Sequence, residues 1–186
     1  LARGVELRNL DETEGSPRSI DPGTTEVGQA VFSPDGSQIL IGGNKTVAVY
    51  STADHSVKTI DSPTFLVRCA AFAADGRLAV TGGQEGTLDF WSVPAWKKIR
   101  TVKTGASEVW SVDFAPDGKT LAVGTNNHTL ELWQTDTLQR ILSLPFRHAA
   151  FTSVAFAPSG EFLVVGTCSL AKDDPFAGSI EILRAK

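Results

Sequence analysis

The pattern of apolar and polar residues divides the chain into short segments separated by turns. Residues 129–133, Thr-Leu-Glu-Leu-Trp, alternate with period two, as expected of a half-buried strand. Residues 109–114 predict a strand before it, and residues 120–123 are apolar enough for a strand buried on both faces. Residues 139–144 predict a fourth, more polar strand. No segment has the pattern of a long amphipathic helix, so the sequence predicts an all-β protein.

This four-strand pattern recurs along the chain. The motif Phe-x3-Gly-x5-Gly occurs four times, with phenylalanines 40, 42 and 42 residues apart, at Phe32, Phe72, Phe114 and Phe156. A fixed period of about 40 residues indicates one supersecondary unit stacked repeatedly. Four short antiparallel strands in about 42 residues are typical of one blade of a β-propeller.

The repeats predict a single propeller domain of about four and a half blades. Complete blades are expected at residues 24–64, 65–106 and 107–148, and residues 149–186 predict an incomplete blade without an outer strand. Residues 1–23 predict a partial blade, consisting of a third and an outer strand joined by an acidic loop. The other predicted first strands are 27–32, 67–72 and 151–156, the second strands 39–41, 78–80 and 163–165, the third strands 46–50, 87–91 and 179–183, and the outer strands 56–60 and 98–102.

Composition narrows the classes of partner. The 186 residues are 41% hydrophobic, with a net charge of −4 and a pI of about 5.4, so no direct nucleic-acid binding is expected. No apolar run approaches the length of a membrane span, and no signal peptide is recognisable. Cys69 and Cys168 are expected to be buried thiols, which favours an intracellular setting, cytoplasmic or nuclear.

The turn and strand-end sequences resemble the WD40 repeat family. Phe-Ser-Pro-Asp-Gly at 32–36, Phe-Ala-Pro-Asp-Gly at 114–118 and Phe-Ala-Pro-Ser-Gly at 156–160 are in register with the third-strand endings at 50–51, 91–92 and 133–134, which replace the family's Trp-Asp. The resemblance covers roughly residues 24–183. WD40 propellers usually have about seven blades, and this chain starts at Leu1 and contains no methionine. We therefore expect part of a longer propeller, a ring completed by a second chain, or a small ring closed by residues 19–20.

The chain departs from the family at its hydrogen-bonding positions. The family's Gly-His pair is absent, and its turn aspartate is replaced by Asn44, Glu85 and Asn127. The family's His–Asp–Ser/Thr–Trp network is therefore not expected. Blade rigidity should depend more on the packing of large side chains, namely Tyr50, Trp91 and Trp133.

No catalytic constellation stands out. None of the three histidines, at 55, 128 and 148, has metal-ligand spacing, and no nucleophile-elbow or phosphate-loop motif occurs. Asp89, Asp113 and Glu131 lie inside predicted strands, where a buried carboxylate must be paired or hydrogen-bonded. We expect no enzyme, metal or cofactor; the alternative is a propeller enzyme with channel carboxylates.

Strand parity predicts where a partner binds. Alternation places Glu108, Trp110, Val112 and Phe114 on one face of the same strand, with the first two at its start. The family resemblance implies that such positions and the turns before the third strands line the partner-binding face, at Glu26, Arg68, Gln84, Glu108, Trp110, Asn126 and Thr152.

Two residue types at this face are common in interface hot spots. Arg68 and Trp110 could together bind an acidic or phosphorylated peptide. The alternatives are an ion pair of Arg68 with Glu108 or Glu26, and a plug between blades for Trp110. A second candidate is the predicted loop insertion 169–177, with Phe176 as its apolar anchor.

The sequence thus predicts a non-catalytic scaffold that binds protein or peptide partners as part of a multiprotein assembly. The alternative to this scaffold is a set of purely architectural blades that completes a larger propeller.

Overall fold

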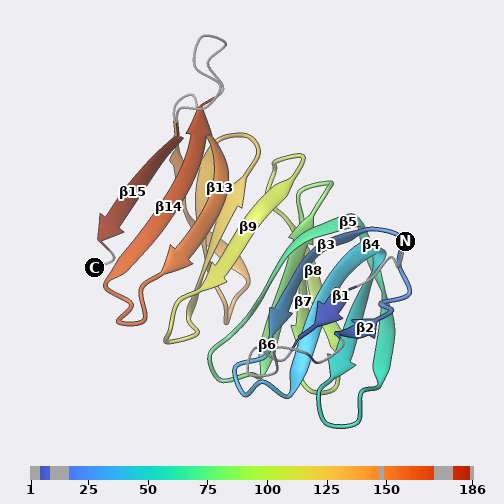
Figure 1. Ribbon diagram of the computed structural model, residues 1–186. Helices are drawn as coiled ribbons and strands as arrows, with labels where there is room; N and C mark the ends of the chain where they lie inside the picture. Colours follow the sequence, from blue (N-terminus) through green and yellow to red (C-terminus); the bar gives the residue numbers. More distant parts are fainter. Residues whose placement is uncertain (1–4, 9–16, 147–148, 170–177, 185–186) are drawn as a thin grey trace.

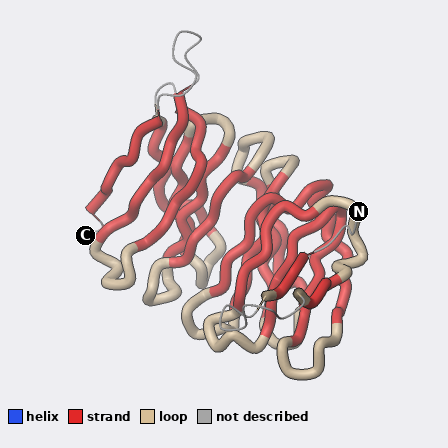
Figure 2. The backbone as a smooth tube through the Cα atoms, viewed as in Figure 1, coloured by secondary structure: helices blue, strands red, loops and turns tan. Residues whose placement is uncertain are grey.

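The computed structural model describes residues 5–8, 17–146, 149–169 and 178–184. Every regular element among them is a β-strand, as Figure 2 shows. The prediction of an all-β chain is therefore confirmed. The strands are β1 (Val5–Leu7), β2 (Arg18–Ile20), β3 (Val27–Phe32), β4 (Gln38–Ser51), β5 (Val57–Phe72), β6 (Leu78–Gly83), β7 (Thr87–Ser92), β8 (Lys97–Lys103), β9 (Val109–Phe114), β10 (Thr120–Thr125), β11 (Thr129–Gln134), β12 (Gln139–Pro145), β13 (Ala149–Phe156), β14 (Phe162–Ser169) and β15 (Gly178–Arg184).

The strands form antiparallel sheets that follow one another in chain order. Strands β9 to β12 make one four-stranded blade, and β13 to β15 make a three-stranded sheet. Strands β3 to β8 form one continuous sheet because β5 serves two blades: its first part pairs with β4 and its second part with β6. The sheets fan out from the blue N-terminal strands to the red C-terminal ones (Figure 1), and no described strand joins the two ends of the fan into a closed ring.

Two strand boundaries differ from the prediction. The outer strand expected at 56–60 and the first strand expected at 67–72 are parts of one strand, β5. The second and third strands expected in the first blade, at 39–41 and 46–50, belong to a single strand, β4. This strand still folds back on itself, because the Thr52 amide donates to the Ser37 carbonyl at 2.9 Å, as the Val93 amide does to Arg77. The turn is one residue shorter than in the next two blades, with Lys45 at φ 55°, so the hairpin has no separate loop.

Apolar clusters fill the spaces between successive sheets. Leu88 and Phe90 of β7 pack with Val112 and Phe114 of the following blade, and all four are buried. Strands β1 and β2 cover the first blade in the same way, with Ile20 against Ile39, Ile41 and Tyr50. Each sheet therefore buries its apolar side chains only by stacking on its neighbour, as in repeat proteins generally.

The backbone conformation of the turns explains why glycine recurs in the motif. In the turn after each first strand, the glycine of the Phe-x3-Gly motif adopts the left-handed conformation, from φ 67° at Gly76 to 74° at Gly160. Hydrogen bonds from Ser33 and Ser37 lower the pKa of the neighbouring Asp35 to about 2. The motif thus encodes a tight turn between the first and second strands.

Buried hydrogen bonds stabilise the blades in addition to the packing of large side chains that the sequence led us to expect. In the second blade, the fully buried Asp89 accepts hydrogen bonds from the hydroxyls of Ser62, Thr64 and Thr101. The Trp91 indole donates to Thr81 at 3.0 Å. The sequence comparison missed this network because its hydroxyls come from other positions, including the outer strand.

The third blade has an ion pair, Glu131 with Arg140, at the matching place. Glu131 occupies the place of Asp89, two residues before the tryptophan, and is also buried. Its carboxylate accepts from the Trp133 indole at 2.9 Å and from the Arg140 guanidinium at 2.7 Å. The predicted structural role of these two strand carboxylates therefore agrees with their contacts.

Candidate partner-binding site

Every first strand carries a β-bulge at the position predicted to face a partner. The pairing of β9 with β10 runs from Ser111↔Gly124 to Val109↔Thr125, which leaves Trp110 unpaired. The same irregularity occurs at Arg68 in β5 and between Phe151 and Ser153 in β13. A bulge interrupts the alternation of side chains and redirects one of them.

The bulge corrects the parity argument. Val109, and not Trp110, joins Val112 and Phe114 in the buried cluster. The Trp110 side chain remains 37% exposed. The expectation of one uninterrupted face through Glu108, Trp110, Val112 and Phe114 is wrong, since strict alternation assumes a regular ladder. Nevertheless, the bulge directs Trp110 outward.

Glu108 links Arg68 and Trp110 into one cluster. One carboxylate oxygen lies 3.5 Å from the Arg68 guanidinium, and the other accepts the Trp110 indole N–H at 2.6 Å. The ion pair that the sequence left open for Arg68 is therefore formed with Glu108. An ion pair at this exposure contributes only about 0–1 kcal/mol to stability.

The turns before the third strands hold this cluster in place. The Glu108 amide donates to the side-chain oxygen of Asn126 at 3.0 Å, and the Asn126 amide donates to the Glu108 carbonyl at 3.1 Å. Gln84 forms an isolated β-bridge with Glu108. Five of the predicted positions thus lie together, at Arg68, Gln84, Glu108, Trp110 and Asn126.

The remaining predicted positions do not join the cluster. Glu26 is exposed beside the first blade, where its carbonyl accepts from the Thr24 hydroxyl. Thr152 lies at the β13 bulge, but its side chain is outside the described part, as are Phe176 and residues 170–177 of the loop insertion. The equivalent position in the first blade is Gly28, where an added Cβ would lie 2.1 Å from the Val67 carbonyl oxygen. That blade therefore presents no side chain there.

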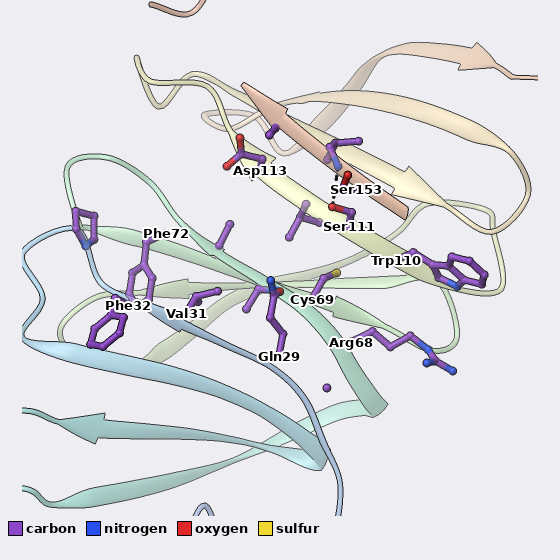
Figure 3. Close-up of a pocket in the computed structure, with 17 residues that line it drawn as sticks. Gln29, Val31, Phe32, Arg68, Cys69, Phe72, Trp110, Ser111, Asp113 and Ser153 are labelled. Atoms are coloured by element: carbon purple, nitrogen blue, oxygen red, sulfur yellow. Dashed lines mark hydrogen bonds between the residues drawn. The ribbon is translucent and has the colours of Figure 1, made fainter. Parts of the chain in front are cut away.

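The cluster opens onto a groove of about 570 Å³ between the first strands of successive blades. Figure 3 shows Arg68 and Trp110 at one end of this groove and Phe32 and Phe72 at the other. Polar side chains along it bridge neighbouring strands. The Ala70 amide donates to Gln29 at 2.7 Å, and the Val154 amide donates to Ser111 at 3.0 Å.

Asp113 is the carboxylate that lines the groove. Burial raises its pKa above the ordinary 3.8, while hydrogen bonds from the amides of Phe156 and Phe114 act in the opposite direction. One carboxylate oxygen accepts from Phe156 at 2.6 Å, so Asp113 joins two blades. The Asp113 carboxylate therefore has a structural role.

The raised pKa predicts a pH dependence of stability. Between pH 3.8 and the higher folded-state pKa, the folded protein binds more protons at Asp113 than the unfolded chain, so stability falls as pH rises through this window. Asp113→Asn keeps an acceptor for Phe156 and removes the charge. We expect the free energy of unfolding of the variant, relative to that of the wild type, to increase as the pH is raised from about 4 to 7. Urea unfolding at several pH values measures this difference. A constant difference across this range would contradict the assignment.

Sequence reasoning missed several groups at this end of the blades. Phe65 is 44% exposed, and the Lys45 ammonium lies 5.4 Å from the centre of its ring. Gln29 lies three residues before Phe32, and Ser111 lies three residues before Phe114. A polar residue at this fixed place in the repeat could have indicated the groove. Phe65 has no such signal, because it precedes the predicted strand.

Two free cysteines lie among the described residues. Cys69 is buried and Cys168 half-buried, both as free thiols; burial raises the pKa of Cys69 to about 12. Within the described ranges, no group of three or more His, Cys, Asp or Glu side chains is arranged to hold a metal ion. Over the same ranges, there is no helix of the length and apolarity that a membrane crossing requires.

Comparison with known sequences identifies the repeats. The profile of the family described as "WD domain, G-beta repeat" matches residues 54–92 and 96–134. The chain contains WD40 repeats. Each matched WD40 segment begins at the outer strand of one blade and ends with the third strand of the next, so the sequence repeat is offset from the sheet.

Two known proteins show similarity to this chain, one in sequence and one in fold. Over 62 residues it is 32% identical to the Intraflagellar transport protein 122 homolog of Danio rerio, a match to 33% of this chain and 5% of that protein. Its fold resembles a chain of the Kuenenia stuttgartiensis hydrazine synthase, with a TM-score of 0.76 at 19% identity, over 93% of this chain and 49% of that one. The WD40 chain therefore spans about half of its structural relative and a small part of its curated relative. At 19% identity, the likeness concerns the fold alone.

Proposed function

We propose that this WD40 chain is a non-catalytic scaffold that binds a protein or peptide partner at the Arg68–Glu108–Trp110 cluster. The observation that carries this proposal is the cluster itself, in which a half-exposed tryptophan and an arginine lie at the mouth of a groove. Both residue types are enriched among interface hot spots. The partner presents an acidic or phosphorylated group to Arg68 and an apolar group to the Trp110 ring.

The setting of this function is a multiprotein assembly inside the cell. Two free cysteines in 186 residues support a reducing compartment. The net charge of −4 argues against nucleic acid as a direct partner. The open fan of sheets supports completion by further blades, from a longer chain or from a second one.

The test compares proteins captured by the immobilised chain and its variants. We expect Arg68→Glu combined with Trp110→Ala to lower the recovery of specific partners at least about tenfold, since two hot-spot residues are lost. The control is Lys98→Glu, the same charge reversal on the exposed outer strand β8. Unchanged recovery with the double variant would overturn the proposed site. Loss with Lys98→Glu alone would favour a purely architectural role through the outer strands.

A further inference from the structure

An exposed aromatic ring and a lysine lie together where the first blade meets the second. The Phe65 ring is 44% exposed, and the Lys45 ammonium lies 5.4 Å from its centre. Lys45 is itself exposed and sits in the turn within β4, with a left-handed φ of 55°. A cation over an aromatic face is held only weakly where water reaches both groups. Both side chains are therefore accessible to a partner.

The backbone connects this pair to the proposed binding cluster. Leu66, next to Phe65 on β5, pairs with Asn44 in the turn of the first blade. The Leu66 carbonyl accepts from the Gln84 amide at 3.1 Å, and Gln84 forms the isolated bridge with Glu108. The pair and the cluster thus lie along one continuous row of turns and strand starts, between blades that the chain itself supplies.

The spacing along this row follows from β5. Phe65 and Arg68 are three residues apart on that strand. An extended strand rises about 3.3 Å per residue, so the two positions lie about 10 Å apart. Residues three positions apart in an extended peptide have the same separation. One short peptide can therefore reach both places.

The two places differ in charge. Arg68 is already paired with Glu108, whereas Lys45 takes part in no salt bridge among the described residues. Its described contact is the Phe65 ring. Charge complementarity at this end of the row therefore favours an acidic side chain, and the exposed ring favours an apolar one beside it.

From these contacts we infer that Lys45 and Phe65 are a second contact point for the partner of the cluster, and that this partner is an extended acidic peptide with apolar side chains. The inference rests on the proposed function. An acidic residue pairs with Lys45, its apolar neighbour covers Phe65, and a residue about three positions away contacts Arg68 and Trp110. Two contact points on one strand select the spacing of the peptide's residues as well as their chemistry.

Selection of a phage-displayed library of random dodecapeptides on the immobilised chain tests this inference. Enriched peptides should carry two acidic–apolar pairs about three residues apart. Their affinities, measured with synthetic peptides by fluorescence anisotropy, should fall at least about tenfold for Lys45→Glu combined with Phe65→Ser, because one of two linked contacts is lost. Lys45→Gln alone, which leaves the ring in place, should give a smaller loss.

The matched control makes the same two kinds of change elsewhere. Lys119→Glu reverses an exposed charge in the turn between β9 and β10, and Ile99→Ser removes an exposed apolar side chain from β8. Combined, these two substitutions should leave the affinity of the enriched peptides unchanged. Equal losses in this control and in the Lys45→Glu, Phe65→Ser variant would overturn the inference.

The cluster variant separates failure of this inference from failure of the proposed function. Peptides weakened by Arg68→Glu with Trp110→Ala, but not by Lys45→Glu with Phe65→Ser, would refute the second contact point and leave the proposed function standing. The reverse pattern would refute the shared site. Peptides unaffected by either variant, or a library without enrichment, would refute both proposals.

Discussion

Replacing Asp89 with alanine is expected to lower the free energy of unfolding by about 3–4 kcal/mol, the largest effect of any single change considered for this WD40 chain. The carboxylate is fully buried and accepts hydrogen bonds from three hydroxyls. Alanine removes the acceptor and leaves the Thr101 hydroxyl without its described partner. Ser62 and Thr64 each lose one of their contacts.

Urea unfolding measures this effect with two comparisons. Asp89→Asn keeps one acceptor oxygen and should fall between the wild type and the alanine variant. Asp136→Ala removes an exposed carboxylate and should change stability by no more than about 0.5 kcal/mol. If Asp89→Ala were as stable as Asp136→Ala, the hydroxyl network would not stabilise the blade.

Removing Arg140 is expected to destabilise the third blade by about 2–3 kcal/mol. Arg140→Met preserves the aliphatic part of the side chain but leaves Glu131 buried with only the Trp133 indole as a described hydrogen-bond donor. Breaking a buried pair from one side typically costs about 3–5 kcal/mol. The effect here is smaller, because the Arg140 side chain is 46% exposed and water can partly replace it.

A second substitution distinguishes charge from packing. Glu131→Gln removes the uncompensated charge and retains an oxygen for the Trp133 indole. The double variant Glu131→Gln with Arg140→Met should therefore recover part of the lost stability, measured as a coupling energy in a double-mutant cycle. Additive losses would show that Arg140 acts through packing and its contact with the Thr104 carbonyl.

Prediction from the sequence succeeded where the information is local. The spacing of Phe32, Phe72, Phe114 and Phe156 encodes a turn with a left-handed glycine, and the same turn occurs at all four places. The alternation of apolar and polar residues located the third strand of each repeat, because this pattern is a local signal of a β-strand. The two WD40 repeats matched at residues 54–92 and 96–134 contain these same local features.

The candidate site was only partly predictable. Arg68, Glu108 and Trp110 were named from strand parity, but the bulge at Trp110 showed that the parity itself was wrong. A bulge depends on the pairing of two strands and cannot be read from either alone. Phe65 and the groove residues became visible only when separate blades were placed side by side.

The strand pattern, the blade repeat and the turns could be read from the amino-acid sequence, because each depends on residues close together in the chain. Two features depend on the tertiary structure: which donor each buried carboxylate meets, and where the bulges redirect side chains. Asp89 meets Thr101 and Glu131 meets Arg140, although both carboxylates occupy the same place in the repeat. Each partner lies on the neighbouring outer strand, and only the pairing of the two strands brings it to the carboxylate.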